Sequence, residues 1–169
     1  MKKVILTGAI GSGKSTVLRA AMQRLGWATP AGYFTHWDGQ PRGAQTLYAE
    51  SWRGERIPMA HRRAPCGGPD AMPPYVLTPD FIPFAATHLT VSEPGQPVVV
   101  DELGLIELET APIITAVSAL FRAANPVWVV IQQRALGKWR LHVPELSAAT
   151  IFAVTPKNRA DLPASIVGA

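Results

Sequence analysis

Residues 8–15 have the sequence Gly8-Ala9-Ile10-Gly11-Ser12-Gly13-Lys14-Ser15, which satisfies the phosphate-loop pattern G-x-x-x-x-G-K-[ST] without a departure. Glycines let the backbone coil into a nest whose N–H groups point inward at phosphate oxygens. We expect Lys14 to reach the β- and γ-phosphates of a nucleotide and the Ser15 hydroxyl to bind Mg²⁺. The predicted nucleotide-binding residues are this loop and the residue after it: Gly8, Ala9, Ile10, Gly11, Ser12, Gly13, Lys14, Ser15 and Thr16.

The segments on either side of the loop have the periodicities that a phosphate loop requires. Residues 3–7 form an apolar, β-branched run that predicts a buried strand. Residues 15–25 then place apolar side chains at helical spacing, and Gly26 is typical of the position after a helix end. The helix N-terminus points its positive dipole end at the same anion. Strand, glycine-rich turn and helix in this order begin an α/β domain.

The remainder of the chain continues the α/β alternation. Strands are predicted at 98–100, 127–131 and 150–154, and helices from about residue 80 to before Pro94 and over 111–124. This order favours a three-layer P-loop sandwich, in which a mostly parallel sheet carries helices on both faces. Residues 32–63 predict a β-hairpin insertion, and the Pro/Gly-rich residues 64–77 predict a loop. We expect a single domain over residues 1–169.

Composition and charge exclude several classes of protein. The chain is 47% hydrophobic with a net charge of +4, which excludes intrinsic disorder. One cysteine, Cys66, cannot form an internal disulfide, and no membrane span or cleaved leader is apparent, so a cytoplasmic, reducing location is expected. Residues 1–63 hold ten Lys or Arg and three acids, whereas residues 64–121 hold seven acids and no Lys or Arg. The two segments are either ordinary surfaces or the two halves of a site that binds phosphate and metal. The sequence has no stripe of Lys and Arg interleaved with aromatic residues, so nucleic acid is not the expected partner.

A second motif supplies acidic groups. Val98-Val99-Val100 is an apolar strand that delivers Asp101 and Glu102 to the carboxyl edge of the sheet. Asp101 is predicted to hold Mg²⁺, together with Ser15 and phosphate oxygens, because Mg²⁺ takes few carboxylates and keeps several waters. Glu102 is predicted to be the general base that orients or deprotonates an attacking water.

Three further blocks resemble the cancer-related nucleoside-triphosphatase family of small P-loop proteins. Val100-Asp101-Glu102-Leu103-Gly104-Leu105-Ile106-Glu107-Leu108 resembles the family block V-D-E-I-G-x-M-E-L, and Gly32-Tyr33-Phe34-Thr35 resembles G-F-[YF]-T. Residues 154–163 resemble V-T-x-x-N-R-D-x-L-P. The blocks stand in family order and, with the phosphate loop, span nearly the whole chain. The resemblance implies Mg²⁺-dependent hydrolysis of nucleoside triphosphates (NTPs) to diphosphates with little base selectivity.

The chain departs from the family pattern at several positions. Leu105 stands where members usually carry a polar residue, Ile106 where they carry Met, and Gln132-Gln133-Arg134 where they often carry His-Arg-Arg. Arg134 is either a catalytic stabiliser of charge at the γ-phosphate or a solvated loop arginine. Asn158 and Arg159 follow the last strand, where open α/β sheets bind ligands. They either contact the base or ribose, or form a capped turn.

Two other functions stay open on the sequence alone. A nucleotide or small-molecule kinase would replace water by an acceptor hydroxyl or phosphate, with arginines of the hairpin or Arg62 and Arg63 at the acceptor. A nucleotide-binding switch or accessory protein would act through a partner, and the hairpin is where contact is expected. Base preference and oligomeric state are not fixed by any motif.

Overall fold

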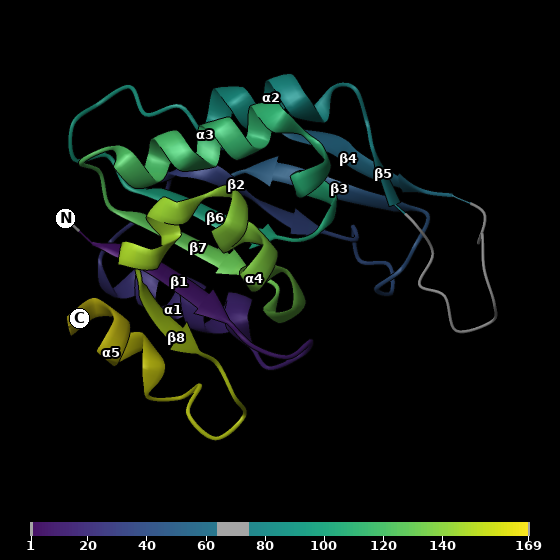
Figure 1. Cartoon of the computed structure of the whole chain (residues 1–169). Helices are drawn as coiled ribbons and strands as arrows, with labels where there is room; N and C mark the ends of the chain where they lie inside the picture. The colour runs from purple at the N-terminus through teal and green to yellow at the C-terminus, as the bar shows by residue number, and fades with distance from the viewer. Residues whose placement is uncertain (1, 64–74, 169) are drawn as a thin grey trace.

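The computed structural model describes residues 2–63 and 75–168, and it has an eight-stranded mixed sheet between two helical layers (Figure 1). The strands, in chain order, are β1 (Lys3–Thr7), β2 (Ala31–His36), β3 (Thr46–Ser51), β4 (Arg56–Arg62), β5 (Tyr75–Leu77), β6 (Val98–Leu103), β7 (Val127–Ile131) and β8 (Thr150–Ala153). The helices are α1 (Lys14–Arg24), α2 (Phe81–His88), α3 (Ala111–Arg122), α4 (Gln133–His142) and α5 (Leu162–Gly168), with short 3₁₀ turns η1 (Ile106–Glu109) and η2 (Pro144–Ala148). The predicted α/β sandwich is confirmed.

The spatial order of the strands is β5-β4-β3-β2-β6-β7-β1-β8. The strands from β2 to β8 in this order run parallel, whereas β3, β4 and β5 extend the sheet antiparallel. β7 therefore lies between β1, which leads into the phosphate loop, and β6, which carries the acids. The carboxyl ends of parallel strands meet at one edge, so this order places residues 8, 101 and 132 near one another.

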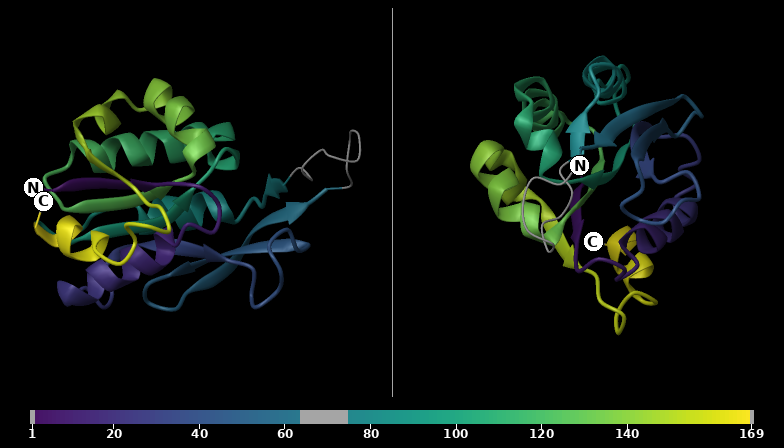
Figure 2. Two further views of the ribbon diagram at one scale, coloured as in Figure 1. Left: turned by 90° about the horizontal axis from the view of Figure 1, so that it is seen from below. Right: turned by 90° about the vertical axis from the view of Figure 1, so that its right-hand side faces the viewer.

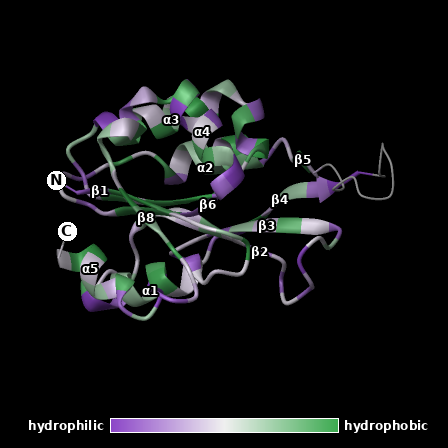
Figure 3. Cartoon of the chain, turned by 60° about the horizontal axis from the view of Figure 1, so that its bottom comes forward, coloured by the Kyte–Doolittle hydropathy of each residue, from purple (hydrophilic) through white to green (hydrophobic). Residues whose placement is uncertain are grey.

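Helices cover both faces of the sheet, as expected. α2, α3 and α4 lie on one face and α1 and α5 on the other (Figures 1 and 2). The hydropathy colouring of Figure 3 shows apolar strands between these layers. Each face has its own core because the side chains of a strand alternate.

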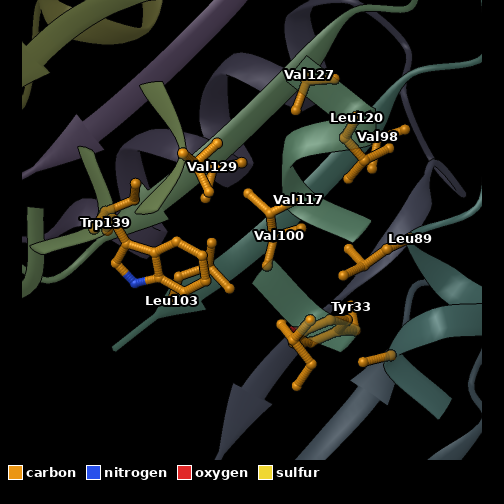
Figure 4. Close-up of a cluster of buried hydrophobic side chains, with 14 of the residues drawn as sticks. Tyr33, Leu89, Val98, Val100, Leu103, Val117, Leu120, Val127, Val129 and Trp139 are labelled. Carbon is orange, nitrogen blue, oxygen red and sulfur yellow. The ribbon is translucent and has the colours of Figure 1, made fainter. Parts of the chain in front are cut away.

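The three valines that precede Asp101 show this alternation directly. Val98 and Val100 belong to the cluster under α2, α3 and α4, whereas Val99 packs with α1 and α5. Figure 4 shows Val98 and Val100 beside Val117 and Leu120 of α3. All three valines are fully buried, and burying each contributes about 1.5–3 kcal/mol. Because this strand is packed on both faces, it holds Asp101 and Glu102 in a fixed position.

Several local predictions are confirmed and two are corrected. α1 begins and ends within a residue of expectation, and Gly26 follows its end with a φ of 67°. β2 pairs antiparallel with β3, as a hairpin requires, but its other edge pairs parallel with β6, so β2 is part of the central sheet. Gly32 permits this approach: a Cβ there would lie 2.0 Å from the Val99 carbonyl oxygen.

The predicted loop over 64–77 is wrong at its end, because Tyr75–Leu77 forms β5 and pairs with β4. Its aromatic and β-branched residues favour a strand once β4 offers an edge. The rest of that loop, with Cys66, lies outside the described residues. α2 begins at Phe81, close to the expected start at about residue 80, and Asp80 is its N-cap.

Candidate active site

The phosphate loop connects β1 to α1 and closes around the Lys14 ammonium. Gly13 caps α1 in the left-handed region with a φ of 97°, where a side chain would strain the backbone. Lys14 Nζ donates to the Gly8 carbonyl at 3.1 Å and to the Ala9 carbonyl at 3.0 Å. The Ser12 hydroxyl is buried and, among the described residues, has no hydrogen-bond partner. A loop with a centrally held ammonium and a free buried hydroxyl fits an anion.

The end of β6 brings a carboxylate to the first turn of α1. Ser15 Oγ donates to Asp101 Oδ1 at 3.0 Å. Asp101 is 5% exposed, and burial raises its pKa to about 6, although the Ser15 hydrogen bond opposes this rise. The nearby Glu102 also raises the pKa, whereas Arg19 and Lys14 lower it. The structure thus brings together the two residues that are predicted to hold Mg²⁺.

Residues that could hold Mg²⁺ are these two oxygen donors. A serine hydroxyl and a carboxylate are hard oxygen ligands, which Mg²⁺ prefers. Within residues 2–63 and 75–168, no group of three or more His, Cys, Asp or Glu side chains forms a complete cage for a metal ion. The donor set therefore fits a cation that takes its remaining ligands from phosphates and water.

Glu102 lies between the phosphate loop and the end of β7. One carboxylate oxygen, Oε2, is 4.0 Å from Lys14 Nζ. The other, Oε1, accepts a hydrogen bond from Gln132 Nε2 at 2.8 Å. Gln132 in turn accepts from Arg134 Nε at 3.3 Å. The side chain of Glu102 is thus oriented from both sides, with its carboxylate toward the lysine that is expected to hold the γ-phosphate.

The turn after Glu102 is held by hydrogen bonds to Glu107 and Trp139, two side chains that no motif in the sequence marks for this role. Gly104 N–H donates to Glu107 Oε2 at 2.9 Å, and Trp139 Nε1 donates to the Gly104 carbonyl at 2.8 Å. Both side chains are buried, and burial raises the pKa of Glu107 to about 7. A Cβ on Gly104 would lie 2.8 Å from Gln132 Nε2, so the glycine makes room for the amide that orients Glu102.

No spacing pattern in the sequence pointed to Gln132 or Trp139. Their partners Glu102 and Gly104 are 30 and 35 residues away, so the contacts depend on how β6, β7 and α4 pack. The available signal was topological: a polar residue directly after a strand that lies between the phosphate loop and the acids. Arg134, which the sequence suggested at this edge, is on the first turn of α4.

Asn158 and Arg159 lie in the turn between β8 and α5. The Asn158 side chain accepts from Thr155 N–H at 2.8 Å and donates to the Ala153 carbonyl at 2.9 Å, which fixes the turn. The Arg159 side chain lies against the phosphate loop: a Cβ on Gly13 would be 3.3 Å from the Arg159 Cδ atom. Contact of these two residues with a base or ribose stays a prediction.

A phosphate pocket of about 290 Å³ opens above the loop. Its lining comes from three segments that the strand order brings together: Gly8, Ala9, Ile10 and Lys14 of the loop, Glu102 after β6, and Gln132, Gln133 and Arg134 after β7. The pocket therefore brings together the loop that is predicted to bind phosphate, the predicted general base Glu102, and Arg134, the candidate for stabilising charge.

Comparison with protein families decides where the chain belongs. The family model described as NTPase matches residues 3–167. The chain belongs to this family. The expected resemblance to the cancer-related nucleoside triphosphatases is confirmed, and it covers nearly the whole chain.

Two solved structures show the same fold as this NTPase. The crystal structure of THEP1 from the hyperthermophile Aquifex aeolicus matches with a TM-score of 0.75 at 20% identity, over 99% of this chain and 98% of that one. The solution structure of a human cancer-related nucleoside triphosphatase matches with a TM-score of 0.72 at 23% identity, over 99% and 96% of the two chains. No curated protein sequence matches the chain. Among the described residues, no helix has the length and apolar character of a membrane span.

Proposed function

We propose that the chain is an Mg²⁺-dependent phosphohydrolase that converts a nucleoside triphosphate to the diphosphate and phosphate, and that Glu102 is its general base. The observation that carries the proposal is the position of Glu102. Its carboxylate is 4.0 Å from the phosphate-loop lysine and is held by a hydrogen bond from Gln132. A base must lie within reach of the water it activates, and that water must face the γ-phosphate.

The chain's own side chains account for the remaining steps of the proposal. Lys14 exchanges its bonds to two loop carbonyls for bonds to the β- and γ-phosphates. Glu102 accepts a proton from the water whose oxygen bonds to the γ-phosphorus, while the bond to the bridging oxygen of the diphosphate breaks. Arg134 lines the same pocket and is proposed to stabilise the charge that develops on the transferred group.

Ser15 and Asp101 are the residues that would hold Mg²⁺. When bound, the cation neutralises charge on the β- and γ-phosphate oxygens. Asn158 and Arg159 are proposed to border the base and ribose, since they lie beside the loop at the carboxyl edge of the sheet. The cytoplasm, where NTPs and Mg²⁺ are both present, is the proposed location.

Replacement of the base tests the assignment. Glu102→Gln keeps the shape of the side chain and a hydrogen-bonding oxygen but cannot take a proton. We expect kcat for phosphate release to fall by about 10²–10⁴-fold, with nucleotide binding retained in equilibrium titration. The matched control is Glu109→Gln, an exposed acid on the 3₁₀ turn η1, which should leave kcat unchanged. Full hydrolysis by Glu102→Gln would refute the role of Glu102.

A further inference from the structure

A second pocket lies on the other side of Glu102 from the phosphate loop. This hairpin pocket has a volume of about 140 Å³ and is lined by β2, β3, β5 and the turn after β6. It shares Glu102, Gln132 and Arg134 with the phosphate pocket. The two cavities therefore meet at one carboxylate, and whatever fills the hairpin pocket contacts the group proposed to activate the attacking oxygen.

The walls of the hairpin pocket are mainly apolar. Trp37 and Tyr75 meet edge to face, with ring centroids 5.3 Å apart, and Leu47, Leu105 and Ile106 are the other large apolar residues of the lining. The hydroxyl of Tyr75 donates to the Ala44 carbonyl. An apolar cavity near 150 Å³ has room for one six-membered ring. A water molecule as the only attacking group needs no such cavity.

The hairpin pocket also has polar side chains in its lining, namely Thr35, Arg42, Glu102, Glu107, Gln132 and Arg134. Glu102 is one of them, and its carboxylate is oriented by Gln132, which also packs against Gly104. Arg42 lies on an exposed turn and contributes a cation to the lining. A pocket with ring-sized apolar walls and the Glu102 carboxylate in its lining fits a small ring compound that presents a hydroxyl to that carboxylate.

We propose that the hairpin pocket is an acceptor site, and that a single-ring alcohol bound there receives the γ-phosphoryl group in place of water. The step is balanced: the alcohol gives its proton to Glu102, and its oxygen bonds to the γ-phosphorus. The bond to the bridging oxygen breaks, so that a phosphate monoester and a nucleoside diphosphate leave. The inference rests on the proposed function, because it uses the same phosphate loop and the same base.

Benzyl alcohol is the probe for this acceptor site, with ethanol as the matched alcohol that lacks the ring. The full-length chain is incubated with γ-³²P-labelled ATP, Mg²⁺ and either alcohol at equal concentration, and phosphate, benzyl phosphate and ethyl phosphate are separated. We expect benzyl phosphate to form at least about tenfold faster than ethyl phosphate, because only the ring is buried by the apolar walls.

Variants of the lining tie the product to the hairpin pocket. Leu47→Trp and Leu105→Phe fill the cavity from two different walls, and each should lower the ratio of benzyl phosphate to inorganic phosphate at least about tenfold. The control is Leu141→Trp, at an 82% exposed position of α4, which should keep the wild-type ratio. The ratio is taken within one reaction, so a general loss of active protein does not change it.

The outcomes separate this inference from the proposed function. Phosphate release with benzyl phosphate no faster than ethyl phosphate overturns the acceptor site and leaves hydrolysis standing. Benzyl phosphate that forms equally in the two cavity-filling variants also overturns it. Benzyl phosphate without phosphate release supports the acceptor site and refutes the hydrolase. Absence of both products overturns both.

Discussion

Gly104→Ala is expected to slow hydrolysis without unfolding the chain. A Cβ at residue 104 would lie 2.8 Å from Gln132 Nε2 and 3.0 Å from its Cδ atom, which is too close for the amide to remain in place. The amide is the far end of a flexible side chain, and it can turn away without moving backbone. Gly104 is not one of the described glycines with a positive φ, so alanine can adopt its backbone conformation. The displaced amide loses its 2.8 Å hydrogen bond to Glu102.

The size of the effect follows from that hydrogen bond. A bond to a charged group contributes about 1.5–3 kcal/mol. The Glu102 side chain is 19% exposed, so water replaces only part of the lost interaction. If the bond serves to orient the base, kcat falls between about tenfold and a hundredfold. Affinity for the nucleotide should change little, because none of the phosphate-loop contacts involves Gly104.

The assay is phosphate release at saturating NTP, with thermal unfolding measured on the same samples. Gly137→Ala is the matched control, since a Cβ at this helical position meets nothing within 4 Å. It should keep the wild-type kcat. A double-mutant cycle with Gln132→Ala then asks whether both changes act through one bond. The Gly104→Ala/Gln132→Ala double variant should be no slower than Gln132→Ala alone.

Three results would contradict this prediction. The first is a wild-type kcat in Gly104→Ala, which would mean that the bond from Gln132 does not orient the base. The second is full additivity in the cycle, which would place the effect of the new methyl group elsewhere. A large loss of thermal stability in Gly104→Ala would also contradict the expectation that only a flexible amide moves.

Three further predictions concern stability and the metal. Burial raises the pKa of Glu107 from 4.5 to about 7, so the folded state binds this proton more tightly than the unfolded state does. The free energy of unfolding should therefore fall by about 3 kcal/mol as the pH rises from 4.5 to 7. In urea unfolding, Glu107→Gln should flatten this dependence on pH. Chelation of Mg²⁺ should abolish phosphate release, and Ser15→Ala should raise the Mg²⁺ concentration needed for half-maximal rate at least about tenfold. Gly32→Ala should destabilise the chain by several kcal/mol in thermal unfolding, about as much as a severe core defect. The new Cβ would lie 2.0 Å from the Val99 carbonyl oxygen, and only a shift of the backbone could relieve that clash.

The parts of the site that the sequence predicted are those carried by short, contiguous segments. The phosphate loop is one run of residues, and Asp101 follows its strand directly, so motif and periodicity together place both. The contact between Ser15 and Asp101 joins residues 86 apart, yet it follows once both segments are assigned to one edge of a parallel sheet. Local patterns suffice when each element is rigid and its neighbours are fixed by topology.

The hydrogen bonds that orient Glu102 and the turn after it could not be predicted from local patterns. Gln132 and Trp139 reach Glu102 and Gly104 through side-chain contacts between elements, and a glutamine or tryptophan at these positions fits many environments equally well. The same limit explains β5. Tyr75–Leu77 is too short to show a period, and it becomes a strand because the edge of β4 is available to pair with it.

The charge pattern acquires a local meaning from the strand order. The segment without Lys or Arg contributes Asp101 and Glu102, and the basic first segment contributes Lys14 and Arg19, whose charges lower the pKa of Asp101 against the effect of burial. β7 lies between β6, which ends in the two acids, and β1, which leads through the phosphate loop into α1 and its two cations, so the residue after β7 lies near both sets. Gln132 is neutral, and it therefore orients Glu102 without competing with Lys14 for the carboxylate. A cation at this position would pair either with Glu102 or with the incoming phosphates, whereas the Gln132 amide donates to Glu102 at 2.8 Å and carries no charge.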